Sequence, residues 1–267
     1  LICSGFATIS DVESTVTPLL NDQDSSIIAI DLGNQRLGGS IVCEVTNQLG
    51  DQVPDVNASK LKMLFEVLQL WLADGILLAY HDRSDGGLLS AICEMLFASR
   101  RGLVAKTPGD FDPKTFWFNE EIGCVIQISS SAKDRVLDTC NRLGFNAHYL
   151  GYPDYTDRLI IKAFDEKILD ETRQNLQKSW SSVSVAMASL RDNPDCADQE
   201  ASQIFKTTKG LDDSKIPFLN NIPEKRRRTK NRPRVAILRE QGSNGHIEMA
   251  YAFNYCGFHA VDVHMSD

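Results

Sequence analysis

Apolar residues recur along the chain with two spacings, and the spacing predicts most of the secondary structure. Apolar positions three and four residues apart predict helices, and short continuous apolar runs predict strands. The predicted helices cover residues 59–73, 88–99, 132–143 (capped by Ser131) and about 246–256; three of the four end at Gly75, Gly144 and Gly257. The predicted strands cover residues 27–32, 76–80, 123–129, 146–150 and 158–163. Strands that alternate with helices in this way indicate an α/β or α+β layered fold.

The stretch from residue 165 to 191 has a longer helical pattern, and we predict one amphipathic helix there. A polar, turn-rich segment follows at residues 191–200. Residues 201–233 lack periodicity and carry a basic run from Lys225 to Arg232, so we interpret them as a linker.

A second pattern begins at Arg234. The strand Val235–Leu238, a polar loop, a helix and the strand Ala260–Val263 predict one βαβ unit of a parallel sheet. Two parallel strands do not make a stable sheet, so we expect this domain to continue beyond residue 267. The predicted division is residues 1–164, then a helical extension and linker over 165–233, then a truncated domain over 234–267. Because the sequence begins with leucine, we expect a piece of a longer protein.

Composition narrows the class of protein. With 42% hydrophobic residues the chain has enough apolar surface for a packed core, and a net charge of −8 argues against a nucleic-acid binder. Seven cysteines without paired spacings argue against structural zinc and favour reduced thiols in the cytoplasm. No apolar run approaches the roughly 20 residues that span a bilayer, so no membrane partner is expected.

The strongest candidate for chemistry is the heptapeptide from His81 to Gly87, which lies between a predicted strand and a predicted helix. Such a turn gathers backbone N–H groups at a helix start, where phosphates bind. We predict that Asp82, nearest the strand end, is a Mg²⁺ ligand, and that Ser84 contacts a nucleotide phosphate or the metal. Asp85 is an alternative helix cap. A plain strand-to-helix turn explains any one of these residues but explains the whole heptapeptide less well.

Three other segments are weaker candidates. We interpret Glu120 and Glu121 as a solvated pair at a strand entrance rather than as ligands. The basic run is better explained as a solvated linker than as an RNA patch or nuclear signal. Cys256, at the end of a predicted helix, is interpreted as structural, because a catalytic cysteine favours a helix N-terminus.

Several segments in one order support a family resemblance. They are His81–Gly87 with Glu94-Met95, Phe118–Glu121, Leu190–Glu200, Val235–Gly242 and Asp262–Asp267. This series resembles the large, single-chain phosphoribosylformylglycinamidine synthases over essentially the whole chain, and the segment Leu190–Glu200 is its most specific part.

The resemblance implies a fold and an activity. The fold is the C-terminal subdomain of a second aminoimidazole-ribonucleotide-synthetase-like copy, a connecting region, and the first βαβ of a class I, flavodoxin-like glutamine amidotransferase. The activity is a ligase reaction of purine biosynthesis, in which ATP and glutamine amidate formylglycinamide ribonucleotide. By position in the motif, Asp82 binds Mg²⁺ and Ser84 contacts ATP or ADP, at a site expected to be auxiliary.

No catalytic residue is assigned to this chain, because the resemblance places the glutaminase cysteine, histidine and glutamate beyond its last residue. The piece alone is expected to be inactive. A non-catalytic nucleotide-binding or interaction module is the alternative function, and a nucleic-acid binder acting through the basic run is a weaker one.

Overall fold

The computed structural model describes residues 4–9, 11–50, 52–109, 111–206 and 231–267. It divides the chain into two compact units, residues 1–206 and 207–267, which are treated separately below. The predicted domain bounds, 1–164, 165–233 and 234–267, stay predictions. Among the described residues, no helix is long and apolar enough to cross a membrane.

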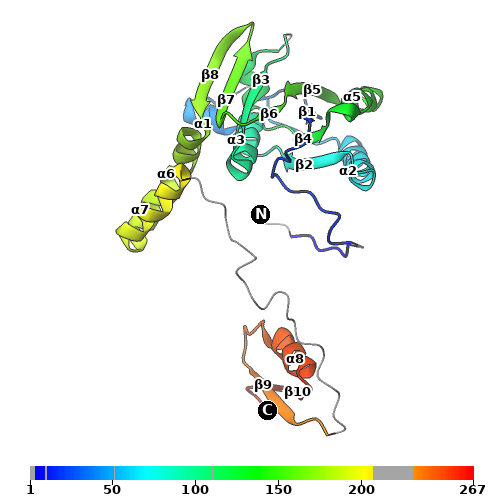
Figure 1. The fold of residues 1–267 in the computed structure, drawn as a ribbon, viewed down its shortest axis with the longest axis vertical. Coiled ribbons are helices and arrows are strands. Elements are labelled where there is room, and N and C mark those ends of the chain that lie inside the picture. The colour runs from blue at the N-terminus through cyan, green and yellow to red at the C-terminus, as the bar shows by residue number, and fades with distance from the viewer. Residues whose placement is uncertain (1–3, 10, 51, 110, 207–230) are drawn as a thin grey trace. The chain divides into compact units, whose positions relative to one another are not determined.

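Unit 1 is built around a four-stranded antiparallel sheet with the order β2-β4-β1-β5 (Figure 1). Its strands are β1 (Ser25–Asp31), β2 (Leu77–Asp82), β4 (Gly123–Ser129) and β5 (Asn146–Gly151). Every residue of β1 is buried, because helices or other strands cover both faces of the sheet. The predicted strands at 27–32, 76–80, 123–129 and 146–150 are therefore confirmed.

The two faces of this sheet carry separate cores, as the alternation of side chains along a strand requires. Ile28, Ile30 and Ile126 pack with α2 (Ala58–Ala73) and α5 (Lys133–Arg142). The opposite face, with Ile27 and Ala29, packs against α3 (Gly87–Ser99), α4 (Pro113–Phe118) and the second sheet. The sheet, which includes β2, thus lies between two packed layers, and α3 belongs to one of them.

The second sheet of unit 1 has the order β6-β3-β7-β8, with β3 and β7 parallel and the other pairs antiparallel. Its strands are β3 (Gly102–Lys106), β6 (Pro153–Asp154), β7 (Arg158–Ala163) and β8 (Glu166–Thr172).

Strand β8 corrects the predicted helix over residues 165–191, which was wrong in its first turns. Phe164 and Asp165 both have positive φ, 49° and 64°, so the chain reverses in a two-residue hairpin and pairs with β7. Neither residue is the glycine or asparagine that usually marks such a turn. The sequence signal was therefore absent.

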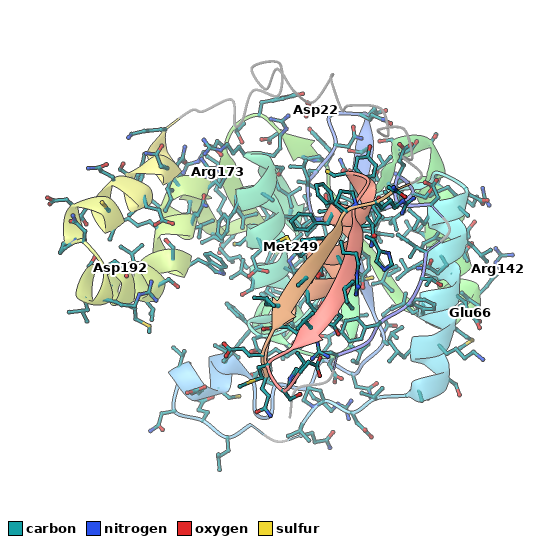
Figure 2. All side chains as sticks on the ribbon, turned by 90° about the horizontal axis from the view of Figure 1, so that it is seen from below. Asp22, Glu66, Arg142, Arg173, Asp192 and Met249 are labelled. Carbon is teal, nitrogen blue, oxygen red and sulfur yellow. The ribbon has the colours of Figure 1, made fainter. Side chains whose placement is uncertain are left out.

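Two helices follow β8, and Arg173 anchors the first of them. Helix α6 (Arg173–Arg191) starts at the Thr172 cap, and α7 (Pro194–Ser202) runs into the short 3-10 helix η2 (Gln203–Phe205). Arg173 and Asp192 mark the two ends of α6 (Figure 2).

The segment predicted to be turn-rich is therefore largely helical. The Asn193 side chain accepts a hydrogen bond from Asp195 N (3.0 Å), and Pro194 opens the helix. An asparagine followed by proline is a helix-start signal, so the prediction of a turn at these two residues was wrong.

Two shorter helices complete unit 1, namely α1 (Ile41–Val45) and the 3-10 helix η1 (Ser130–Ala132). Because η1 precedes α5, the predicted Ser131 cap is wrong: the Ser131 hydroxyl lies 2.6 Å from the Ser129 hydroxyl, and α5 has no side-chain cap.

Unit 2 is the predicted βαβ element. Strand β9 (Arg234–Arg239) pairs in parallel with β10 (His259–His264), and α8 (His246–Tyr255) connects them. The part of the basic run from Lys225 to Lys230 lies outside the described residues.

Candidate functional site

The heptapeptide predicted to carry chemistry forms the end of β2, a turn and the first residue of α3. Side chains alternate along it: the Arg83 side chain is only 3% exposed, whereas Asp82 is 70% exposed and Ser84 and Asp85 also face solvent. The inward residue anchors the turn, and the outward ones are free to meet a ligand.

Arg83 is the anchor that the sequence analysis left without a role. Its Nε donates to the Glu121 carbonyl (2.7 Å), and its Nη1 donates to Oδ2 of Asp31 (3.0 Å). Its backbone N–H donates to the Gly123 carbonyl (2.9 Å). A buried guanidinium requires partners of this kind, and here they fasten the turn to β1 and to the entrance of β4.

Besides Arg83 N, two backbone N–H groups at the start of α3 are satisfied within the chain. Gly86 N donates to Oε1 of Glu120 (2.8 Å), and Gly87 N donates to the Ser84 carbonyl (3.0 Å). A carboxylate of the protein thus sits where the sequence analysis placed a phosphate. Asp85 does not cap α3, whose N-cap is Gly86 at φ 81° without a side-chain bond.

The glycine pair brings the turn against the chain that enters β4. Gly87 has φ 70°, and a Cβ atom there would lie 2.7 Å from the carbonyl carbon of Phe118. The absence of a side chain at Gly87 therefore permits a close approach to the backbone of Phe118.

The interpretation of Glu120 and Glu121 as a solvated pair was wrong. Oε1 of Glu120 also accepts from Ile41 N (3.0 Å), and the Glu121 side chain is fully buried. Arg36 donates to both Glu121 oxygens, from Nε (2.6 Å) and from Nη2 (2.9 Å).

Burial raises the pKa of Glu121, but the Arg36 guanidinium and the N–H groups of Asn34 and Arg36 outweigh it and hold that pKa below its usual value. The two carboxylates therefore join the loop after β1 to the candidate turn. Arg36 and Ile41 lie about 80 residues from these carboxylates in sequence, and Gly86 lies 34 residues from Glu120, so no local pattern indicated them.

The exposed face of the turn offers oxygen ligands. Among the described residues, the Ser84 hydroxyl and the Asp85 carboxylate make no side-chain hydrogen bond, and no three His, Cys, Asp or Glu side chains are grouped to hold a metal. Mg²⁺ on a nucleotide uses one or two carboxylates together with phosphate oxygens and water. The exposed carboxylate of Asp82 fits that kind of ion, and the turn does not fit an all-protein cage.

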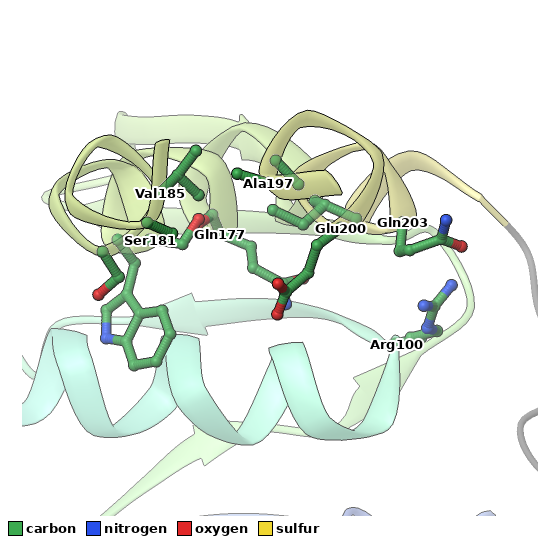
Figure 3. Close-up of a pocket in the computed structure, with 12 residues that line it drawn as sticks. Arg100, Gln177, Ser181, Val185, Ala197, Glu200 and Gln203 are labelled. Atoms are coloured by element: carbon green, nitrogen blue, oxygen red, sulfur yellow. The ribbon is translucent and has the colours of Figure 1, made fainter. Parts of the chain in front are cut away.

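A separate cleft of about 390 Å³ lies between α6, α7 and the end of α3 (Figure 3). Its lining includes Arg100, Gln177, Trp180 and Glu200, and no residue of the turn lines it. In unit 2, Cys256 follows the last residue of α8, as predicted, and is exposed. The side chain of Arg239, the last residue of β9, donates to the Asp262 carboxylate (2.8 Å).

Two family models match the chain. Residues 25–162 match the AIR synthase related protein C-terminal domain, and residues 232–267 match the CobB/CobQ-like glutamine amidotransferase domain. The first match covers the first sheet, α3 and most of the second sheet, including the candidate turn.

Solved structures from Thermotoga maritima share the fold of this chain. They are phosphoribosylformylglycinamidine synthase II (17% identity, TM-score 0.51, covering 62% of this chain and 28% of that one), PurL complexed with FGAR (14%, 0.53, 62% and 30%) and PurL complexed with ADP (15%, 0.50, 62% and 27%). This chain spans less than a third of the length of those proteins. The chain belongs to the AIR synthase related proteins, and it carries their C-terminal domain followed by a segment of a glutamine amidotransferase domain.

Proposed function

We propose that this chain is part of a phosphoribosylformylglycinamidine synthase, a ligase that uses ATP and glutamine to amidate formylglycinamide ribonucleotide in purine biosynthesis. The observation that carries the proposal is the order of two domains on one chain. An AIR synthase C-terminal domain precedes a glutamine amidotransferase segment, which matches a synthetase supplied with ammonia by its own glutaminase. Similar folds crystallised with FGAR and with ADP support the same substrate classes.

Within this function, Asp82 holds Mg²⁺ and Ser84 contacts the nucleotide phosphates. The bound ion supplies charge neutralisation of the phosphates. The protein positions the turn. Arg83 fixes it through the Glu121 carbonyl, and the Glu120 carboxylate accepts hydrogen bonds from the backbone N–H groups of Gly86 and Ile41. Because a carboxylate of the protein already accepts from Gly86 N, that donor is not open to a transferring phosphoryl, which favours an auxiliary nucleotide site over a catalytic one.

The test is Asp82→Asn in the complete protein, with Asp85→Asn as the neighbouring control. We expect Asp82→Asn to weaken Mg²⁺–ADP binding about tenfold or more, because the amide cannot replace the carboxylate charge. Asp85→Asn should change binding several times less. Calorimetric titration with ADP, with and without Mg²⁺, measures both.

The rate of amidation by the Asp82→Asn variant distinguishes an auxiliary nucleotide site from a catalytic one. If the Asp82 site is auxiliary, Asp82→Asn keeps most glutamine-dependent amidation while Mg²⁺–ADP binding at the turn is lost. Loss of amidation with nucleotide retained would contradict the auxiliary role. Complete protein that binds nucleotide but never amidates formylglycinamide ribonucleotide would support the non-catalytic module instead.

A further inference from the structure

A row of polar contacts connects helix α6 to the candidate turn. The Trp180 indole N–H donates to Oε1 of Glu94 (3.0 Å), and Oε2 of Glu94 lies 2.9 Å from Nε2 of His81. The other ring nitrogen of His81, Nδ1, donates to the carbonyl of Asp82 (2.7 Å). One imidazole thus joins a carboxylate of α3 to the backbone of the turn.

These contacts act on the peptide that carries the predicted metal ligand. The Asp82 carbonyl accepts from His81, and the N–H of the same peptide, on Arg83, donates to Gly123. With both polar groups of the peptide held, the direction in which the Asp82 side chain leaves the strand is fixed. The Asp82 carboxylate itself lies 3.8 Å from Nδ1 of His81.

Trp180 brings α6 into this arrangement. Its ring packs edge-on against Phe97 of α3, with centroids 5.8 Å apart, and it also lines the cleft between α6 and α7. A shift of α6 therefore changes the hydrogen bond to Glu94.

We propose that His81 is a positioning residue for the Asp82 site, and that Glu94 and Trp180 couple its orientation to α6. The coupling of α6 to turn order stands on the contacts above. Its effect on Mg²⁺–nucleotide binding rests on the proposed function. Because coupling free energies are reciprocal, a ligand bound at the turn stabilises the Trp180–Glu94 hydrogen bond by the same free energy by which that bond stabilises the ligand.

Two substitutions divide the His81 contacts. In His81→Asn the amide nitrogen takes the place of Nδ1 and keeps the bond to the Asp82 carbonyl. In His81→Gln it takes the place of Nε2 and keeps the contact with Glu94. We expect hydrogen exchange of the amides from Arg83 to Gly87 to be about tenfold faster in His81→Gln and only about threefold faster in His81→Asn, because the first releases the peptide and the second cuts only the link to α6.

The link to α6 is tested with Trp180→Phe, which keeps the ring contact with Phe97 and removes the N–H donor. We expect turn exchange to rise about threefold in the wild-type background and to stay unchanged in His81→Asn, where the link is already cut. Met187→Ala, an exposed position on the same helix, is the control and should leave the turn unchanged.

Equal exchange in His81→Gln and His81→Asn, or a Trp180→Phe effect that persists in His81→Asn, would overturn the positioning role. Both measurements are made without ligand, so they stand apart from the proposed function. With ligand, His81→Gln should weaken ADP binding about tenfold in Mg²⁺ and leave metal-free binding unchanged. Wild-type protein whose ADP affinity ignores Mg²⁺ would instead refute the proposed role of Asp82 and leave the exchange result valid.

Discussion

Gly87 is the residue at which the turn and the chain entering β4 come closest. We expect Gly87→Ala to lower the free energy of unfolding by about 3 kcal/mol, since it combines a positive φ with overlap against backbone that cannot move aside. Urea unfolding followed by circular dichroism measures the loss.

Gly75→Ala is the matched control for that measurement. Gly75 has nearly the same φ, 67°, but nothing lies within 4 Å of an added Cβ. It should cost about 1 kcal/mol, the conformational strain alone. Equal losses in the two variants would show that the close approach to Phe118 contributes nothing.

Glu121 makes a pH-dependent contribution to stability. Because its pKa is held below the usual glutamate value in the folded state, its contribution is complete above the unfolded pKa and is lost as pH falls through the folded pKa. We expect the thermal midpoint of the wild type to fall between about pH 5 and pH 3, and Glu121→Gln to flatten part of that fall.

Glu66→Gln is the control for the pH series, because Glu66 is exposed and forms only a 3.9 Å pair with Lys62. It should leave the slope unchanged. A Glu121→Gln slope that matches the wild type would mean that other carboxyl groups cause the acid loss.

The sequence located the candidate turn but not what holds it. Asp82 and Ser84 were found because they stand between an apolar run and a helix pattern, which is local information. Arg83 binds Asp31 and Glu121, which are 52 and 38 residues away. One local signal was available. The alternation of side chains along β2, continued past the strand, places Arg83 on the inward face and Asp82 and Ser84 on the outward face.

At the scale of elements, Arg173 fastens the start of helix α6 to Asp157, which precedes β7, and to η2. Its side chain is 3% exposed and donates to Asp157, Gln177 (2.6 Å) and the Ile204 carbonyl. We expect Arg173→Ala to lower the free energy of unfolding by about 3 kcal/mol, because it leaves the Asp157 carboxylate without its buried partner. Chemical denaturation measures this.

Arg158→Ala provides the comparison, since Arg158 also pairs with an aspartate, Asp170, but is 41% exposed. Its effect should be several times smaller. A loss in Arg158→Ala as large as that in Arg173→Ala would contradict the role of burial.

The prediction of helices and strands succeeded where apolar residues kept the same spacing along the whole element. Helix α2, strand β4 and the βαβ of unit 2 follow their apolar patterns closely. It failed at β8 and α7, where the decisive features were a turn made by Phe164-Asp165 and a cap made by Asn193. The cap is a one-residue signal that a window of apolar positions averages away, and the turn lacks the residues that usually mark one.

At the scale of the whole molecule, the two units differ in how much core they have. Unit 1 contains both apolar clusters, whereas Ile237 is the one buried hydrophobic residue among those described in unit 2. We expect a chain ended at Lys206 to unfold cooperatively with the thermal midpoint of unit 1 unchanged, as measured by calorimetry. A midpoint lowered by more than a few degrees would show that unit 2 stabilises unit 1.

The contrast between Trp180 and the other two tryptophans has a practical consequence. Trp71 and Trp117 are 3% and 2% exposed, whereas Trp180 is 60% exposed. A collisional quencher such as acrylamide therefore lowers mainly the fluorescence of Trp180 on α6, while the two buried tryptophans are quenched much less. The native chain carries its own optical reporter of that helix, and no label has to be attached to follow it.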